Sequence, residues 1–352
     1  MQSETATKGW AVDKRRLLRP ALCIFLALTA FLSLETGAAG VRLTGALASV
    51  LSGVALSPME QVVLWDIRMP RLLTGVLVGA GLAVAGAILQ GLFRNPLADP
   101  GIVGVNAGAG LGAILAIVMG AALPGPVRNI IGVYLVPLSA FVFAWGTVAL
   151  LTAVATRRGQ TSVATMLLAG IALAALAFAL SGVLINMADD QQLRDLTFWN
   201  LGSLAGASWA KVFAASPLII GALLVALSLG KGLNGLALGE ATAVHIGIDV
   251  QWLKRLAILC VAGAAGAAVA VSGGIGFVGI VVPHLLRLVS GPDHRALLGN
   301  SALLGASLLL LADLLARTII APAELPIGIV TSLIGAPFFL WILLRKRGLV
   351  DL

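Results

Sequence analysis

The sequence is divided into about ten apolar runs, each about as long as a helix that crosses a membrane. A helix needs roughly 20 mostly apolar residues to cross a hydrocarbon core of about 30 Å. Inside lipid the backbone polar groups must be satisfied within the segment, so runs of this length are expected to be helices. The predicted spans are residues 17–36, 72–90, 102–121, 131–154, 163–184, 212–230, 254–271, 275–290, 297–316 and 327–344.

The composition agrees with a chain that lies almost entirely in the membrane. Only 11% of the 352 residues are charged, against about 25% in soluble domains. We therefore expect an all-α polytopic membrane protein, with a single transmembrane domain over residues 1–352 and no soluble domain.

The first apolar run could belong to a signal peptide or to the first transmembrane helix. Four basic residues lie between positions 14 and 19, and Gly37-Ala38-Ala39 resembles a cleavage site. The run is long for a signal peptide, so we favour an uncleaved first helix preceded by a cytoplasmic tail at residues 1–16.

The distribution of basic residues predicts the orientation. About two thirds of the 23 lysines and arginines fall in segments that lie on one side if both termini are placed there. Positive residues favour the cytoplasmic side, so both termini are expected to be cytoplasmic. The basic residues are scattered over helix ends rather than gathered on one face, which argues against nucleic-acid binding.

Motifs for chemistry are absent from the sequence. No G-x-x-x-x-G-K-[ST] loop is present to hold nucleotide phosphates. No Ser-His-Asp, H-E-x-x-H or G-x-S-x-G arrangement appears, so we expect no catalytic residues. His245, His284 and His294 lack metal-ligand spacing, and Cys23 and Cys260 lie in apolar runs. A carrier or a pore is the expected class.

Glycines four residues apart recur inside the spans, as at Gly75 and Gly79 and at Gly104, Gly108 and Gly112. Small residues at this spacing let helix backbones approach closely in lipid. Packing within one chain is the favoured interpretation, and a dimer seam is the alternative.

A polar elbow at residues 92–110 separates the second and third spans. Pro96 and Pro100 are expected to stop the helices on the cytoplasmic side, and Asp99 is expected to be the N-cap of the next helix.

The longest connection on the predicted cytoplasmic side, residues 231–253, contains an amphipathic segment. Residues 236–248 place Leu238, Ala241, Val244 and Ile248 at helical spacing. A helix on a lipid surface usually has a basic polar face, whereas this one carries Glu240 and His245. The sequence therefore favours a groove in a partner protein.

One acidic residue lies inside a predicted span. Asp313 is near the outer end of the ninth span, and acids in spans are candidates for functional sites. Arg317 follows at i+4, which favours a structural or rim-exposed ion pair.

Several long motifs resemble the FecCD-like permease subunits of ABC importers for iron siderophores, haem and vitamin B12. They occur in the family's order from about Arg68 onward. The matching stretches are RMPRL (68–72), GAGLAVAGAILQ (79–90), NPLADP (95–100), LALGEATAVHIGI (236–248), GGIGFVGIVVPHLLRL (273–288), GPDHR (291–295), LLLADLLAR (309–317) and AELPIGIVTSLIGAPFFLW (323–341).

The resemblance implies an assembly in the bacterial inner membrane. It implies ten transmembrane helices per subunit, a homodimer with a central path, two ATPase subunits that use ATP and Mg on the cytoplasmic side, and a periplasmic binding protein. It also implies no resident cofactor. The residues that match the family's ATPase contact are Leu238, Gly239, Glu240, Ala243, His245 and Gly247, and those that match its binding-protein contact are Arg68, Arg71 and Arg317.

The substrate is predicted from residues 186–206, between the fifth and sixth spans. Arg194 could bind a carboxylate, and Phe198 and Trp199 offer flat apolar surfaces. These features favour haem over a ferric siderophore or vitamin B12. The alternative is that Arg194 pairs with Asp190 and that the aromatic residues form an interfacial belt.

An ion-coupled secondary carrier is the alternative class, and a channel is a weaker one because no charged or carbonyl filter stands out.

Overall fold

The computed structural model describes the backbone of residues 3–37, 39–101, 103–120 and 123–345. Over these residues the chain is a bundle of helices with one short antiparallel hairpin, in which Thr156 pairs with Thr161. The elements of the first half are α1 (Ser3–Glu35), α2 (Leu43–Leu51), α3 (Pro58–Gln61), the π-helical turn η1 (Val62–Arg68), α4 (Met69–Leu92), α5 (Val105–Gly120), α6 (Gly125–Ala155), β1 (Thr156–Arg157) and β2 (Gln160–Thr161). Those of the second half are α7 (Val163–Ile185), α8 (Asp190–Leu201), α9 (Trp209–Ser228), α10 (Gly230–Ala237), α11 (Glu240–His245), α12 (Val250–Ser272), α13 (Val278–Ser290), α14 (His294–Thr318) and α15 (Ile327–Arg345).

Each predicted span corresponds to one of these helices, so the prediction of an all-α polytopic membrane protein is confirmed. Among the described residues, seven helical segments are long and apolar enough to cross a membrane, and α3, η1 and α4 together form one of them. Three shorter apolar helices, α5, α13 and α15, match the other predicted spans. Helix α1 begins at Ser3, so most of the predicted tail at residues 1–16 is helical.

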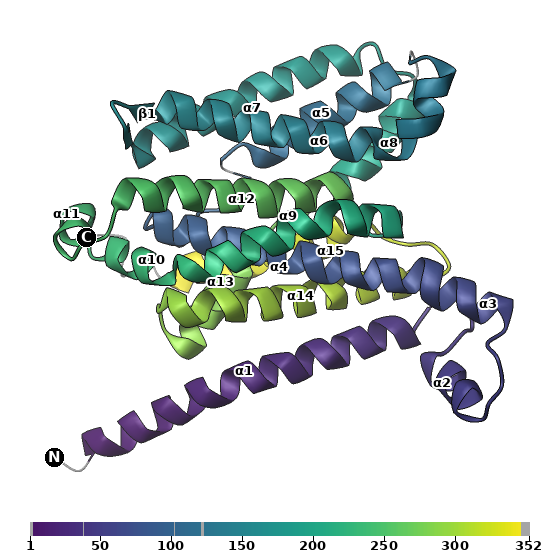
Figure 1. The fold of residues 1–352 in the computed structure, drawn as a ribbon, viewed down its shortest axis with the longest axis horizontal. Coiled ribbons are helices and arrows are strands. Elements are labelled where there is room, and N and C mark those ends of the chain that lie inside the picture. Colours follow the sequence, from purple (N-terminus) through teal and green to yellow (C-terminus); the bar gives the residue numbers. More distant parts are fainter. Residues whose placement is uncertain (1–2, 38, 102, 121–122, 346–352) are drawn as a thin grey trace.

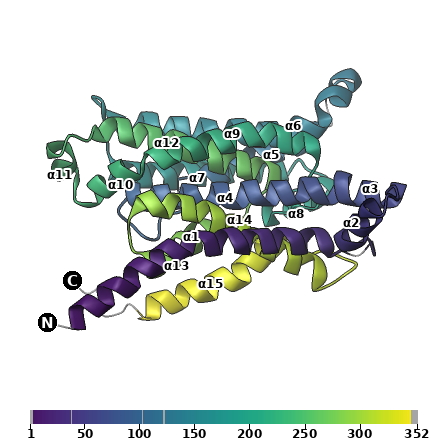
Figure 2. The same cartoon turned by 60° about the horizontal axis from the view of Figure 1, so that its bottom comes forward.

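The bundle has two distinct ends (Figure 1). The β1–β2 hairpin, α10, α11 and the start of α1 lie at one end, which we call the hairpin end. Helices α2, α3 and α8 lie at the other, which we call the α8 end. The figure labels several of the segments that the charge distribution predicts to be cytoplasmic. All of these labelled segments lie at the hairpin end. Figure 2 shows α1 along the outside of the bundle, and α1 packs against α14.

Helices α4 and α12 form the buried centre of the bundle. Most of the side chains of both are buried, whereas α7 is largely exposed. Glycines allow close contacts between helices, both at this centre and between α5 and α6. A Cβ on Gly79 would lie 2.8 Å from the Gly305 carbonyl carbon in α14, and one on Gly108 would lie 2.8 Å from the Phe143 oxygen in α6. The glycines at Gly79 and Gly108 therefore serve packing within the chain, as expected.

Two local predictions were wrong. Asp99 does not cap the next helix, because α5 begins only at Val105, and the Asp99 carboxylate instead accepts from the Gly101 amide at 2.8 Å. Residues 236–248 do not form one helix. Gly239 has a φ of +109°, a conformation that suits glycine, and it separates α10 from α11. Propensity and apolar spacing do not reveal such a break.

Candidate functional site

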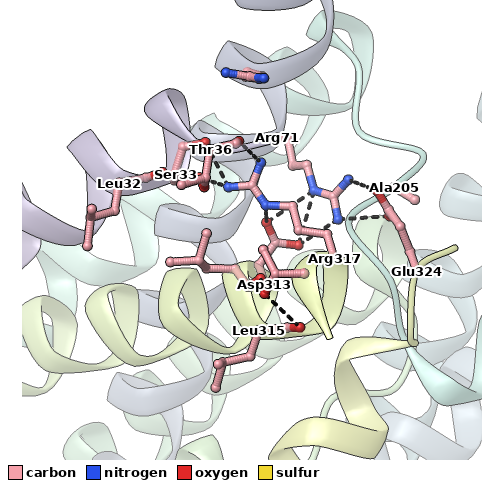
Figure 3. Close-up of polar contacts among 12 residues, drawn as sticks. Leu32, Ser33, Thr36, Arg71, Ala205, Asp313, Leu315, Arg317 and Glu324 are labelled. Carbon is pink, nitrogen blue, oxygen red and sulfur yellow. Dashed lines mark hydrogen bonds and ion pairs between the residues drawn. The ribbon is translucent and has the colours of Figure 1, made fainter. Parts of the chain in front are cut away.

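The first cluster of charged side chains lies at the α8 end and centres on Asp313 (Figure 3). The Arg71 side chain, from the first turn of α4, donates to both Asp313 oxygens at 2.8–3.1 Å. The same guanidinium donates to Glu324, in the loop before α15, at 2.9 and 3.0 Å. Arg71 therefore bridges two carboxylates in a geometry that is among the strongest available to a charged pair.

Two more arginines tie the end of α1 to this cluster. Arg317 lies 3.6 Å from Asp313 and donates to the backbone oxygens of Ser33 at 2.7 Å and Thr36 at 3.0 Å. Arg68 donates to the Leu34 and Glu35 carbonyl oxygens. The last four carbonyls of a helix lack partners within the helix, so these guanidinium groups stabilise the end of α1.

The side chains of the three arginines predicted to contact the binding protein are therefore largely buried within the subunit. Arg68 is 4% exposed and Arg71 is 9% exposed. The Asp313–Arg317 pair is present, but Asp313 is 0% exposed, so the pair is structural and not exposed at the rim. The sequence indicated only Arg317, at i+4, as a partner of Asp313. It did not show Arg71, which is 242 residues away along the chain.

The second candidate region is the connection at the hairpin end that contains α10 and α11. Leu238, Val244 and Ile246 project large apolar side chains that are more than half exposed, while Ala243 is buried. Two polar residues predicted to contact the ATPase subunits, Glu240 and His245, already have partners within the subunit. Glu240 pairs with Lys254 at 2.8 Å, and His245 Nδ1 lies 2.7 Å from the Ala241 oxygen. Glu240, Thr242 and His245 are also exposed, so the surface between Gly239 and Gly247 combines these polar groups with the apolar side chains.

A polar contact holds α10 to the turn before α14. Asn234 donates to Asp293 at 2.7 Å and accepts from the His294 amide at 2.9 Å. The hydrogen bonds from Asn234 and the Arg295 amide hold the pKa of Asp293 below its ordinary value. Asp293 thus stays a carboxylate near neutral pH and anchors the segment that leads to α11.

The third region is α8, which lies between two of the long spans. Asp189 and Gln192 form a capping box at its start. Arg194 is exposed and donates to Gln191 at 2.9 Å, rather than pairing with Asp190. Phe198 and Trp199 line a cavity of about 470 Å³, but Arg194 does not. The basic residue on this cavity is Lys211, whose Nζ donates to the Gly206 oxygen at 2.8 Å.

The structure does not bring all the predicted site residues together. It places Phe198 and Trp199 on one cavity and gathers Arg71, Asp313 and Arg317 in one cluster. Glu324, Lys211 and Lys254 were not predicted from the sequence as site residues. The available signal for Lys254 was its place at the start of the apolar run 254–271, because buried lysines are rare unless paired.

Comparison with known proteins assigns the chain to a class. Residues 25–345 match the model of the FecCD transport family. The chain is 48% identical over 284 residues to the Hemin transport system permease protein HmuU of Yersinia pestis, covering 80% of this chain and 83% of that protein. It is 44% identical over 287 residues to the Cobalamin import system permease protein BtuC of Halobacterium salinarum, covering 82% of this chain and 74% of that protein. A solved structure of a metal-chelate type ABC transporter in an inward-facing conformation superposes with a TM-score of 0.81 at 35% identity, covering 94% of this chain and 99% of that one.

Proposed function

The chain belongs to the FecCD transport family, and we propose that it carries haem, or a related iron chelate, across the bacterial inner membrane as the permease subunit of an ABC importer. It is a multi-pass membrane protein of this class. We further propose that two copies form the central path and alternate between outward and inward access. The observation that carries the proposal is the match to permease proteins over at least four fifths of the chain.

We propose that ATP is hydrolysed by two separate subunits that bind at the hairpin end. The absence of a phosphate-binding loop from this sequence supports that division. Leu238, Val244 and Ile246 would insert into grooves on those subunits, with Gly239 and Gly247 allowing close backbone approach. Exposed apolar side chains grouped in this way are typical of a protein contact.

Haem is the substrate that the α8 region supports best. The flat faces of Phe198 and Trp199 suit a planar macrocycle. Lys211 lines the same cavity and offers positive charge to the carboxylates of the macrocycle, whereas Arg194 lies outside the cavity. A ferric siderophore or vitamin B12 is the alternative within the family. Family membership argues against an ion-coupled carrier.

Substrate choice is tested in proteoliposomes that contain the permease with its ATPase subunits and its binding protein. We expect ATP-dependent uptake with haem and little with a ferric siderophore or vitamin B12. Phe198→Ala should reduce haem uptake by up to about tenfold, because one aromatic contact contributes about 0.5–1.5 kcal/mol.

The matched control is Phe213→Ala, since Phe213 is similarly exposed but stacks on Trp209 instead of lining the cavity. Uptake of a siderophore alone would keep the importer and remove the haem assignment. Uptake that follows an ion gradient without ATP would contradict the proposed function itself.

We propose that the binding protein docks at the α8 end through Arg68, Arg71 and Arg317. Each of these arginines already has acceptors within the subunit. Glu324 is the partner that a carboxylate of the binding protein could most easily replace, because its side chain is 37% exposed, whereas Asp313 is fully buried.

Docking is tested by two changes of opposite effect. Glu324→Gln removes the internal competitor and should raise the affinity for the binding protein about two- to fivefold at low salt, which is the range for one partly exposed ion pair. Arg71→Glu combined with Arg317→Glu should weaken binding and uptake, measured on the folded fraction because both arginines pair with the buried Asp313. The measurement is the dissociation constant as a function of salt concentration.

Asp190→Asn is the control, because it removes one exposed charge at the same end outside the cluster. Unchanged affinity and uptake in the charge-reversal variant would rule out docking through these arginines.

A further inference from the structure

Lys254 stands out among the charged residues of the hairpin end because it is almost completely buried. It lies in the second turn of α12, and it is 2% exposed. A buried ammonium group is strongly destabilising unless it is paired. Its Nζ donates to the Glu240 carboxylate at 2.8 Å and to the Thr161 carbonyl oxygen at 2.8 Å. One side chain therefore joins α12 both to α11, the preceding helix, and to the β1–β2 hairpin, which is 93 residues away in the sequence.

The hairpin is held to α12 at a second point. The Thr161 amide donates to the Gln251 side-chain oxygen at 2.9 Å, one turn before Lys254. Both backbone groups of Thr161 are thus bound by side chains from the start of α12. Glu240 is the first residue of α11, so a movement of α11 acts directly on the same ammonium group.

Helix α12 connects this point to the α8 end. It has 23 residues, which corresponds to a length of about 35 Å. Most of it is buried against α4 and other helices, so it resists bending. At its far end the Ser272 oxygen accepts from the Ser203 amide at 2.8 Å, just after α8. The Gly274 amide donates to the oxygen of Trp199, which lines the candidate substrate cavity.

We infer that Lys254 is a positioning residue that couples α11 to α12, and through α12 to the α8 segment. A movement of α11 displaces Glu240. The Glu240–Lys254 ion pair transmits this displacement to the start of α12. The hairpin moves with it, because the Thr161 carbonyl oxygen is bound to the same ammonium group. An apolar side chain could fill the same space with less desolvation cost, but it would not hold Glu240 at a fixed point. The inference rests on the proposed function, because it takes α11 as the contact for the ATPase subunits.

The test measures substrate transported per ATP hydrolysed by the complete complex in proteoliposomes. Lys254→Met keeps most of the apolar stem and removes the ammonium group. We expect it to lower the transport ratio about tenfold, within the range by which residues in coupling networks alter coupling, while the ATPase subunits still co-purify. Lys254→Arg should restore at least half of the ratio. Lys231→Met is the matched control, because Lys231 is an exposed lysine on neighbouring α10.

A transport ratio for Lys254→Met equal to that of Lys231→Met would overturn the inference. If Lys254→Met does not fold, Glu240→Gln replaces it, because this change neutralises a half-exposed carboxylate and leaves the bond to Thr161 in place. Glu240→Gln should lower the transport ratio in the same direction, and a ratio equal to that of the unchanged protein would also overturn the inference.

A second readout separates this inference from the proposed function. Hydrogen exchange in the isolated permease reports whether Lys254 holds the hairpin and α11, whatever binds there. In Lys254→Met, or in Glu240→Gln for α11 alone, the amides of these segments should exchange faster than in Lys231→Met. Failure of any ATPase subunit to bind the unchanged permease would count against the proposed function. Unchanged exchange in these variants would count against the inference.

Discussion

Asp313→Asn is expected to destabilise the folded permease by about 3–5 kcal/mol, the range for breaking a buried ion pair by removing one partner. The carboxylate is fully buried and serves two guanidinium groups, those of Arg71 and Arg317. Asparagine keeps the shape but removes the charge, so both arginines lose their shared partner. The measurement is the midpoint of thermal unfolding in detergent.

Glu324→Gln is the control for Asp313→Asn. It removes the other carboxylate bound by Arg71, but its side chain is partly exposed, so the unfolding midpoint should change little. Equal midpoints for Asp313→Asn and Glu324→Gln would show that burial of Asp313 does not determine the stability of the cluster.

Gly86→Ala is expected to have the second large effect, because it forces apart two helices that touch through their backbones. A Cβ at Gly86 would lie 2.5 Å from both the Cα and the carbonyl carbon of Gly279 in α13, and nearer still to its oxygen. No side chain can rotate away to relieve this contact. Overpacking of a close-packed interior costs about 1–3 kcal/mol and occasionally more, and we expect the upper end here. The yield of folded protein and its unfolding midpoint are the measurements.

Gly182→Ala provides a matched control. Gly182 lies in α7, where an added Cβ meets no atom within 4 Å. Alanine there should leave stability unchanged or raise it by up to about 1 kcal/mol through its better helix propensity. A loss in Gly86→Ala no greater than the change in Gly182→Ala would contradict the close α4–α13 contact.

Motifs and local hydropathy were sufficient for the class of protein. The predicted spans at residues 163–184 and 254–271 agree with α7 and α12 within a few residues at each end. The long ordered motifs predicted the family that the comparisons show. Both signals are local, because an apolar run or a short motif can be recognised without knowing which segments of the chain pack together.

Short irregular segments were harder to predict. The division at Gly239 and the start of α5 at Val105 depend on single backbone conformations. Apolar spacing alone continues through both positions, so it extended the helices too far. Such errors fall at the ends of helices, where propensity is weak and neighbouring segments decide the conformation.

By itself, the sequence determined that the chain is an all-α membrane protein of the permease class, because crossing lipid requires long apolar helices whose polar backbone groups are bonded internally. The tertiary structure alone decided which partners the charged side chains have. Arg71 and Asp313 are 242 residues apart, and Lys254 and Thr161 are 93 residues apart. Hydropathy identifies Arg71, Asp313 and Lys254 only as charged residues near helix ends. Their partners depend on which segments of the chain pack side by side.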